Sequence, residues 1–154
     1  MSLLLIDTDI ASFIFKGSDY VNSYLPLLSG HELALSFMTV AELFQWAILR
    51  QWGNSRLAQL EQYLSNYVII PVDQPLCQEW AQVRVDRRSA GRAISPQDAW
   101  IAATALRYDL PLITHNIKDF REIPNLRLIA LSHAMIWIED GCSHLAEKAR
   151  EPGP

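Results

Sequence analysis

The chain of 154 residues has few cysteines, no long apolar run and no excess of positive charge. Its two cysteines, Cys77 and Cys142, lie far apart and give no zinc-binding spacing. We interpret them as thiols of a reducing cytoplasm, with a single disulfide as the alternative. The short apolar run at the N-terminus follows no basic segment, and no run reaches the length of a membrane span. We therefore expect neither export nor membrane insertion.

Charge and motif content exclude further classes. Thirteen Lys and Arg against 17 Asp and Glu give a formal net charge of −4. This balance argues against a wholly basic protein that coats nucleic acid, but it permits a local basic patch. No glycine-rich phosphate loop follows the first apolar run, and the sequence contains no recognisable Ser/His/Asp or Cys/His arrangement. Half of the residues are hydrophobic and 19% are charged, which is typical of a globular protein with one sizeable core.

Short apolar runs alternate with segments of helical periodicity along the chain. The expected strands are residues 3–6, 33–38, 67–72, 112–114 and 126–131. The expected helices are residues 10–28, 40–51, 56–67, 75–89, 96–108 and 134–150. Strands separated by helices predict a three-layer α/β/α sandwich around a five-stranded parallel sheet. Residues 1–131 should form this domain, 132–150 a C-terminal helical extension, and 151–154 a disordered tail.

Four acidic residues stand where an expected strand ends or an expected helix begins: Asp7, Glu42, Asp98 and Asp119. If the strands are parallel, all four carboxylates arrive at one edge of the sheet, where ligands bind in such folds. Crowded carboxylates repel one another unless a cation lies among them. Oxygen ligands favour Mg²⁺ or Mn²⁺ over zinc. Such an ion suits phosphodiester hydrolysis, because it activates a bound water and stabilises charge on the phosphate.

Helix capping is the alternative explanation for each acid taken separately. Glu42 lies three residues after Thr39 and Asp98 three residues after Ser95, which is the spacing of a capping box. The other two acids can cap the helices that follow them. Capping does not explain why acids recur at one edge of the sheet, so their joint occurrence favours a cation site.

Four segments in order carry a family resemblance: residues 5–9, 39–43, 94–105 and 112–120. Together they resemble the PIN-domain ribonucleases, and in particular the VapC-type toxins of bacterial toxin–antitoxin pairs. The resemblance implies the strand order 3-2-1-4-5 and Mg²⁺- or Mn²⁺-dependent endonucleolytic cleavage of RNA. It also implies a homodimer and a small antitoxin protein as partner, which would bind along the first two helices.

The resemblance also implies the catalytic and metal-binding residues. The first three acids of the family correspond to Asp7, Glu42 and Asp98. Many members place a fourth acid where this chain has Asn116, so Asp119 supplies the carboxylate of that segment. Asn116 would then bind a metal-bound water or position Asp119.

Three further polar residues belong to the matching segments. Thr8 and Thr114 correspond to residues that orient the metal ligands or water. Asp9 stands where the family often has Asn or Ser, so it either adds negative charge to the site or points away.

A basic patch leads into Asp98 and is the expected RNA-binding surface. Its members are Arg84, Arg87, Arg88 and Arg92, of which the first three share a helix face at i, i+3 and i+4 spacing. The alternative is that these arginines complement the dipole of the last helical turn and remain solvated.

Two other functions compete with the nuclease. A PIN-like scaffold that binds RNA or protein without cleaving remains possible because of Asn116. A phosphorylatable receiver-like domain also carries acids at strand ends, but this chain has no convincing lysine after the last expected strand.

Overall fold

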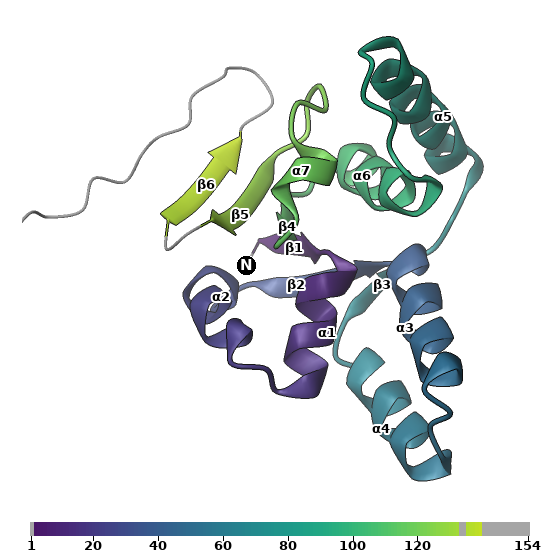
Figure 1. Ribbon diagram of the computed structural model, residues 1–154, viewed down its shortest axis with the longest axis vertical. Helices are drawn as coiled ribbons and strands as arrows, with labels where there is room; N and C mark the ends of the chain where they lie inside the picture. Colours follow the sequence, from purple (N-terminus) through teal and green to yellow (C-terminus); the bar gives the residue numbers. More distant parts are fainter. Residues whose placement is uncertain (1, 133–134, 140–154) are drawn as a thin grey trace, which may run out of the picture.

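A central sheet organises the computed structural model, which describes residues 2–132 and 135–139. Within those residues the strands lie in the order β3-β2-β1-β4-β5-β6 (Figure 1). The strands are β1 (Leu3–Ile6), β2 (Glu32–Ser36), β3 (Val68–Ile70), β4 (Leu112–Thr114), β5 (Leu128–Ser132) and β6 (Met135–Glu139). All pairs from β3 to β5 are parallel. The predicted parallel five-stranded sheet of order 3-2-1-4-5 is therefore confirmed.

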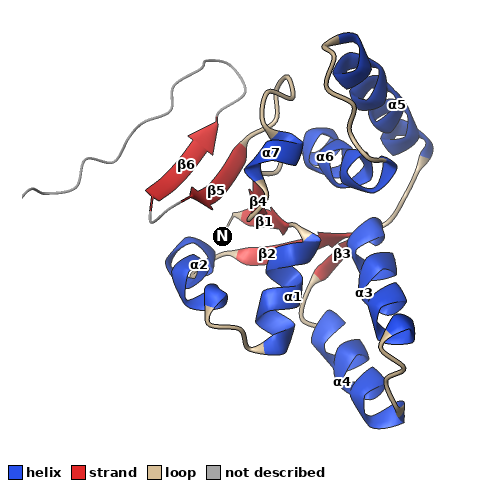
Figure 2. Ribbon diagram, viewed as in Figure 1, coloured by secondary structure: helices blue, strands red, loops and turns tan. Residues whose placement is uncertain are grey.

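Helices cover both faces of the sheet (Figure 2). They are α1 (Thr8–Lys16), α2 (Tyr20–Leu28), α3 (Phe37–Leu49), α4 (Asn54–Leu64), α5 (Gln74–Ser89), α6 (Pro96–Tyr108) and α7 (Ile117–Phe120). Alternate residues of β1 feed two cores: Leu5 packs with α5, α6 and α7, whereas Leu4 and Ile6 pack with α1, α2, α3 and α4. This alternation is the side-chain period of a strand buried on both faces. The three layers predicted from the sequence are thus present.

The segment expected to be one helix over residues 10–28 is two helices. Gly17 ends α1 with φ of 65°, and its N–H donates to carbonyls at the end of that helix. This left-handed conformation is accessible to glycine at little steric cost, so the chain turns there before α2 begins. None of the helices in the described residues is long and apolar enough to cross a membrane.

The segment after β5 differs from its prediction. Residues 134–150 were expected to be helical, but Met135–Glu139 forms β6, antiparallel to β5 with Leu128 opposite Glu139. Four consecutive apolar residues lack the period of an amphipathic helix, and β-branched and aromatic residues suit a strand. Pairing also satisfies backbone groups that β5 would otherwise expose at the edge of the sheet. The remainder of the expected extension and the tail lie outside the described residues.

The central strands determine where the site lies. Strand β1 pairs with β2 on one side and β4 on the other, with Leu5 opposite Ala34 and Leu112. Because these strands are parallel, their carboxyl ends meet at one edge, as expected for a ligand site in this kind of sheet.

Candidate active site

Asp7 lies at the centre of this edge, directly after β1. Its side chain is 6% exposed and is the N-cap of α1. One carboxylate oxygen accepts a hydrogen bond from the backbone N–H of Thr8, and the other accepts one from the Thr114 hydroxyl, each at 2.7 Å. Burial raises the pKa of Asp7 well above its ordinary value, and the charge of Asp9 raises it further. The structure thus fixes an acid in a place where its charged form is disfavoured.

Glu42 of α3 is held by Thr8 of α1. The Thr8 hydroxyl donates to the Glu42 carboxylate at 3.0 Å and also lies 3.0 Å from the Thr39 hydroxyl. Burial is the main cause that raises the pKa of Glu42. Thr8 therefore fixes the direction of the Glu42 carboxylate, while its role in orienting a metal ligand, which the family resemblance implied, stays a prediction.

The capping-box explanation is wrong for Glu42. Helix α3 begins earlier than expected, and its N-cap is Ser36, whose hydroxyl accepts from the backbone N–H of Met38 at 3.1 Å. Thr39 is instead a buried residue inside the helix. Glu42 then lies beyond the first turn, where a carboxylate cannot reach the free backbone N–H groups. Its position is not explained by capping.

The capping prediction for α6 is confirmed. Ser95 is the N-cap, Pro96 opens the helix, and the Ser95 hydroxyl accepts from the backbone N–H of Asp98 at 3.1 Å. This bond fixes the backbone of Asp98 at the carboxyl edge of the sheet. Burial is the main cause that raises the pKa of Asp98, and the charge of Asp119 also raises it.

Asn116 and Asp119 form a hydrogen-bonded pair. The Asn116 side-chain amide donates to the Asp119 carboxylate, and the Asn116 backbone N–H donates to the Thr114 hydroxyl at 3.0 Å. Thr114 thereby bonds both Asp7 and the turn that carries Asn116. Of the two roles expected for Asn116, the structure favours positioning Asp119.

Asp9 is a member of the site that the sequence left undecided. It does not point away: its carboxylate accepts from the backbone N–H of Ile10 at 2.7 Å and from that of His115 at 3.0 Å. Burial raises its pKa, as does the charge of Asp98. Its separation of two residues from Asp7 was the available signal, but only the contact with His115 reveals its direction.

Three other acids of the site lie close enough to Asp98 for its charge to affect their pKa values. Its charge contributes to the raised pKa of Asp7, Asp9 and Glu42, although burial is the largest cause for each. These acids come from three elements that are far apart in sequence. The structure therefore brings the predicted carboxylates into electrostatic contact and adds Asp9 to them.

The donor set fits a hard divalent cation. The group supplies carboxylate and amide oxygens, and a cation would relieve the cost of burying several like charges. Within the described ranges, however, no group of three or more His, Cys, Asp and Glu side chains is placed so that it could hold a metal ion together. Mg²⁺ keeps several waters in proteins and needs only one or two carboxylates, so an open arrangement is compatible with it.

The four arginines of the predicted RNA-binding patch lie in different environments in the structure. Arg87 is 5% exposed and its guanidinium donates to the Arg121 carbonyl at 2.9 Å. This contact holds the guanidinium inside the domain, so its contribution to an RNA-binding surface stays a prediction that its burial does not favour. Arg92 pairs with Glu122, while Arg84 lies over the Trp80 ring and Arg88 is exposed.

Comparisons with known proteins agree with this geometry. The PIN domain family model matches residues 4–126. Ribonuclease VapC1 of Haemophilus influenzae (strain R2866) is 28% identical over 127 residues, covering 81% of this chain and 95% of the relative. Ribonuclease VapC19 of Mycobacterium tuberculosis (strain CDC 1551 / Oshkosh) is 33% identical over 125 residues, covering 80% and 96%. The crystal structure of VapBC2 from Rickettsia felis bound to a promoter DNA fragment aligns with TM-score 0.72 and 27% identity, covering 82% of this chain and 96% of that one. The chain therefore belongs to the PIN-domain family, among the VapC-type ribonucleases.

Proposed function

We propose that the protein is a metal-dependent endoribonuclease and the toxin of a VapBC-type toxin–antitoxin pair. The observation that carries this proposal is the set of one buried and two half-buried acids, Asp7, Glu42 and Asp98, that β1, α3 and α6 bring to the carboxyl edge of the sheet. Buried acids in a folded protein cost stability unless a partner offsets their charge, and such groups cluster at functional sites. Relatives named ribonuclease VapC support RNA as the substrate.

The proposed roles follow from the hydrogen bonds. Bound Mg²⁺ or Mn²⁺ would supply an activated water and stabilise negative charge on the attacked phosphate. Asp7 and Asp98 are the principal ligands, joined by Asp119. Asn116 orients Asp119, and its own amide oxygen remains able to face water.

Thr8 and Thr114 maintain the arrangement around these ligands. Thr114 donates to Asp7, which leaves the remaining lone pairs of the carboxylate for a cation. Thr8 donates to Glu42, which is proposed to ligate a second ion or its water. Asp9 adds negative charge next to Asp7 and so strengthens attraction for a divalent cation.

A protein partner is the second part of the proposal. Structures of related toxins, including VapBC-1 from nontypeable Haemophilus influenzae, are of VapBC complexes. We propose that a small antitoxin binds this chain along α1 and α2, which together occupy the first of the two expected helices, residues 10–28 and 40–51, that the family resemblance assigned to this partner. Copurification of the toxin with the product of a neighbouring reading frame tests this partner, and loss of that binding in variants of α1 and α2 is expected.

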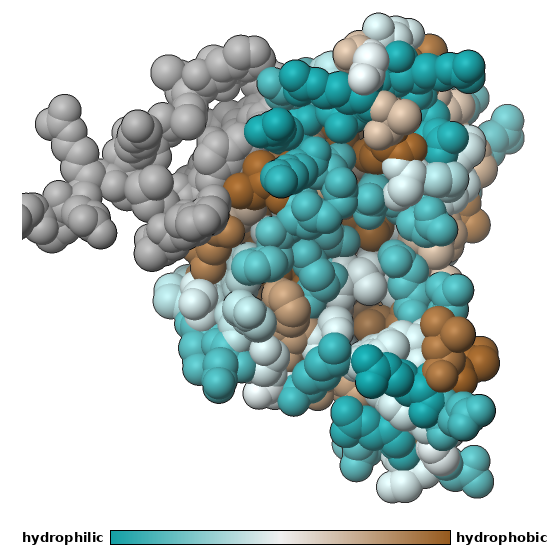
Figure 3. Space-filling view, viewed as in Figure 1, coloured by the Kyte–Doolittle hydropathy of each residue, from teal (hydrophilic) through white to brown (hydrophobic). Residues whose placement is uncertain are grey.

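A homodimer is proposed on a separate surface. Ile48 and Leu49, at the end of α3, are each 74% exposed, and the apolar area at the lower right of Figure 3 lies over this end of the helix. Adjacent exposed apolar side chains of this size often mark a protein interface. Sedimentation of the purified protein as a strict monomer at micromolar concentration would contradict the dimer.

Substitution of Asp98 by Asn tests the nuclease proposal. The amide keeps the size of the side chain and leaves the backbone bond to Ser95 intact, so the fold should persist. Loss of one charged ligand should reduce Mg²⁺-dependent cleavage of total RNA by about 100-fold or more, since several kcal/mol of charge stabilisation is lost. The measurement is single-turnover cleavage followed on a sequencing gel.

Asp86→Asn is the matched control. Asp86 is an acid of α5 that accepts from the Gln82 side chain, and its charge is not among those that raise the pKa of Asp7, Glu42 or Asp98. Its replacement should leave the cleavage rate unchanged. Full activity of Asp98→Asn would contradict the mechanism, and thermal stabilisation by Mg²⁺ without cleavage of any RNA tested would instead favour a non-catalytic scaffold.

A further inference from the structure

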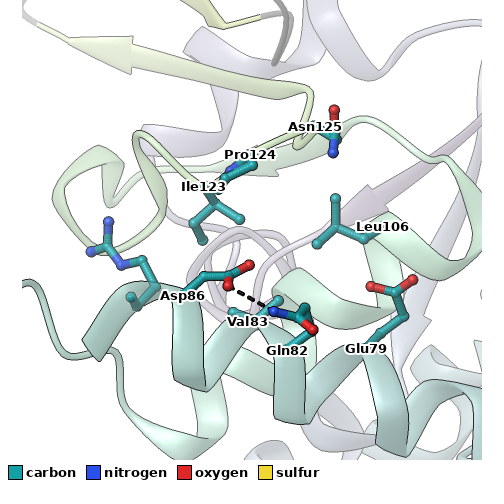
Figure 4. A pocket seen from close by; sticks show the side chains of 9 residues that line it. Glu79, Gln82, Val83, Asp86, Leu106, Ile123, Pro124 and Asn125 are labelled. Carbon is teal, nitrogen blue, oxygen red and sulfur yellow. Dashed lines mark hydrogen bonds between the residues drawn. The ribbon is translucent and has the colours of Figure 1, made fainter. Parts of the chain in front are cut away.

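Among the grooves lined by helix α5, two differ in charge. One, shown in Figure 4, has a volume of about 230 Å³ and includes the carboxylates of Glu79 and Asp86 together with Gln82. The other, on a different side of the helix, has a volume of about 500 Å³ and is lined by Trp80, Arg84 and Arg88 with neighbouring small and aliphatic side chains. No acidic residue lines this second groove, which we call the arginine groove.

An aromatic cluster ends at Trp80, which lines the arginine groove. Phe37 of α3 contacts Trp100 of α6 edge to face at 5.2 Å between ring centroids. Trp100 in turn stacks on Trp80 of α5, with centroids 4.9 Å apart and planes 22° apart. The Arg84 guanidinium lies over the Trp80 ring at 5.3 Å from its centroid. The stack therefore passes through three helices and ends in a guanidinium.

The stack is tied to the carboxyl edge of the sheet. The indole N–H of Trp80 donates to the carbonyl of Pro96 at 3.1 Å, and Pro96 lies two residues before Asp98. Trp100 lies two residues after Asp98 on the same helix. Trp80, which lines the arginine groove, therefore contacts the first turn of α6, the turn that also carries Asp98.

Arg84 has unused hydrogen-bonding capacity. Its buried Nη1 has no hydrogen-bond partner among the described residues, a condition that costs about 1–3 kcal/mol for a buried donor. Arg88 follows one turn later on the same helix face and is exposed. The groove thus combines two cationic groups, of which Arg84 has one nitrogen without an acceptor among the described residues, with the indole ring of Trp80.

We propose that the arginine groove binds single-stranded RNA beside the bond to be cleaved, with one base stacked on the Arg84 guanidinium as the next layer of the Phe37–Trp100–Trp80 stack. Arg84 and Arg88 bind adjacent phosphates. Arginine planes and aromatic rings are the usual platforms for unpaired bases, whereas the bases of a duplex have no free face. The absence of a carboxylate from the lining matches the charge of the RNA backbone. This proposal rests on the proposed function, because it assigns part of the substrate of the same site.

The test is a binding titration that does not depend on catalysis. The protein carries Asp98→Asn, no divalent metal is added, and the probe is a fluorescein-labelled single-stranded RNA of about 12 nucleotides, within the range that such platforms accommodate. Arg84→Gln should weaken binding about tenfold, since stacking of one base contributes about 1–3 kcal/mol. The slope of log affinity against log salt should also flatten by about 0.7 for the lost phosphate contact.

Arg107→Gln is the matched control. Arg107 also lies over an aromatic ring, that of Tyr108 at 5.2 Å, but it is exposed where Arg84 is half-buried, and it is not part of the arginine groove. Its loss should change affinity less than twofold, although it removes the same charge. Arg84→Lys separates the phosphate contact of Arg84 from its stacking on a base. It should restore the salt slope, which reports the charge, but not the affinity, because an ammonium group offers no plane for a base.

Three outcomes would overturn the proposal. They are equal losses in Arg84→Gln and Arg107→Gln, full affinity of Arg84→Gln for the single strand, and an equal tenfold loss on a duplex of the same sequence. The last outcome would indicate attraction of charge without stacking. Because the titration uses no metal, its failure is distinct from failure of the nuclease proposal, which is judged by cleavage in the wild-type protein and in Asp98→Asn.

Discussion

At the residue scale, the proposed site is marked by an acid, Asp7, that is buried close to other negative charges. Asp7 is buried, bonded by Thr8 and Thr114, and still has a raised pKa, because hydrogen bonds offset only part of the cost of burial. The sequence predicted Asp7 because it directly follows an apolar strand. It could not settle the direction of Asp9, since that depends on a backbone N–H of His115 far along the chain.

Replacing Asp7 by Asn should stabilise the metal-free protein at neutral pH. An acid whose pKa is raised in the folded state binds more protons there than in the unfolded state, so stability falls as pH rises from its ordinary pKa, near 3.8, through the raised one. Asn cannot ionise, so the variant should lose less stability than the wild type as the pH rises. A gain of about 1 kcal/mol would raise Tm by about 3 °C for a chain of this size.

Thermal unfolding in excess chelator, recorded at several pH values, measures this effect. In wild-type protein Tm should decrease between mildly acidic and neutral pH, and Asp7→Asn should show a smaller decrease. Addition of Mg²⁺ at neutral pH should stabilise the wild type more than the variant. An Asp7→Asn protein that is less stable than wild type at neutral pH in chelator would show that Asp7 has a structural rather than a cation-binding role.

At the element scale, helix beginnings determine where the acids lie. Ser95 caps α6 as the sequence predicts, because Ser95 followed by Pro96 is an unambiguous helix start. The start of α3 was misplaced, since Ser36 and Thr39 are both good capping residues and only packing of the strand before them decides between the two. Strand β6 was missed because a short apolar run fits either a helix or a strand until an edge strand is available to pair with it.

Loss of the α6 cap should affect both stability and metal binding. Ser95→Ala removes the hydroxyl that accepts from the Asp98 backbone, at a cost of about 1 kcal/mol. The first turn should then fray, so the concentration of Mg²⁺ that gives half-maximal cleavage should rise several-fold. Cleavage rates recorded across a Mg²⁺ titration, together with thermal unfolding, provide both quantities.

Asp73→Ala provides the comparison for that variant. Asp73 caps α5 through a 2.8 Å bond from the backbone N–H of Leu76, and α5 carries none of the proposed metal ligands. A similar loss of stability with an unchanged Mg²⁺ requirement is expected. If both variants shifted the Mg²⁺ requirement equally, the effect of Ser95 would be one of general stability and not of the position of Asp98.

At the scale of the whole molecule, a parallel sheet gathers acids that are far apart in the chain. The order 3-2-1-4-5 places β1 between β2 and β4, so Asp7 lies between the segments that carry Glu42 and Asp119. The family resemblance supplied this order, because alternation of strands and helices predicts a parallel sheet without fixing its sequence of strands. Helical spacing placed Arg87 on the same face as Arg84 and Arg88 but could not predict that it is buried. Its hydrogen-bond partner is the Arg121 carbonyl, which no pattern within α5 indicates.

The central claim is that these acids bind a cation that drives attack of water on RNA, and the chemistry of the cleaved ends tests it most directly. A defined single-stranded RNA is incubated with wild-type protein in chelator and in Mg²⁺, and the product ends are identified by mass spectrometry. If the cation drives attack of water, the RNA should be cleaved only when Mg²⁺ or Mn²⁺ is present. The products should carry linear phosphate ends, because water is the nucleophile. Cleavage in excess chelator, or 2′,3′-cyclic phosphate ends produced by the neighbouring ribose hydroxyl, would contradict it.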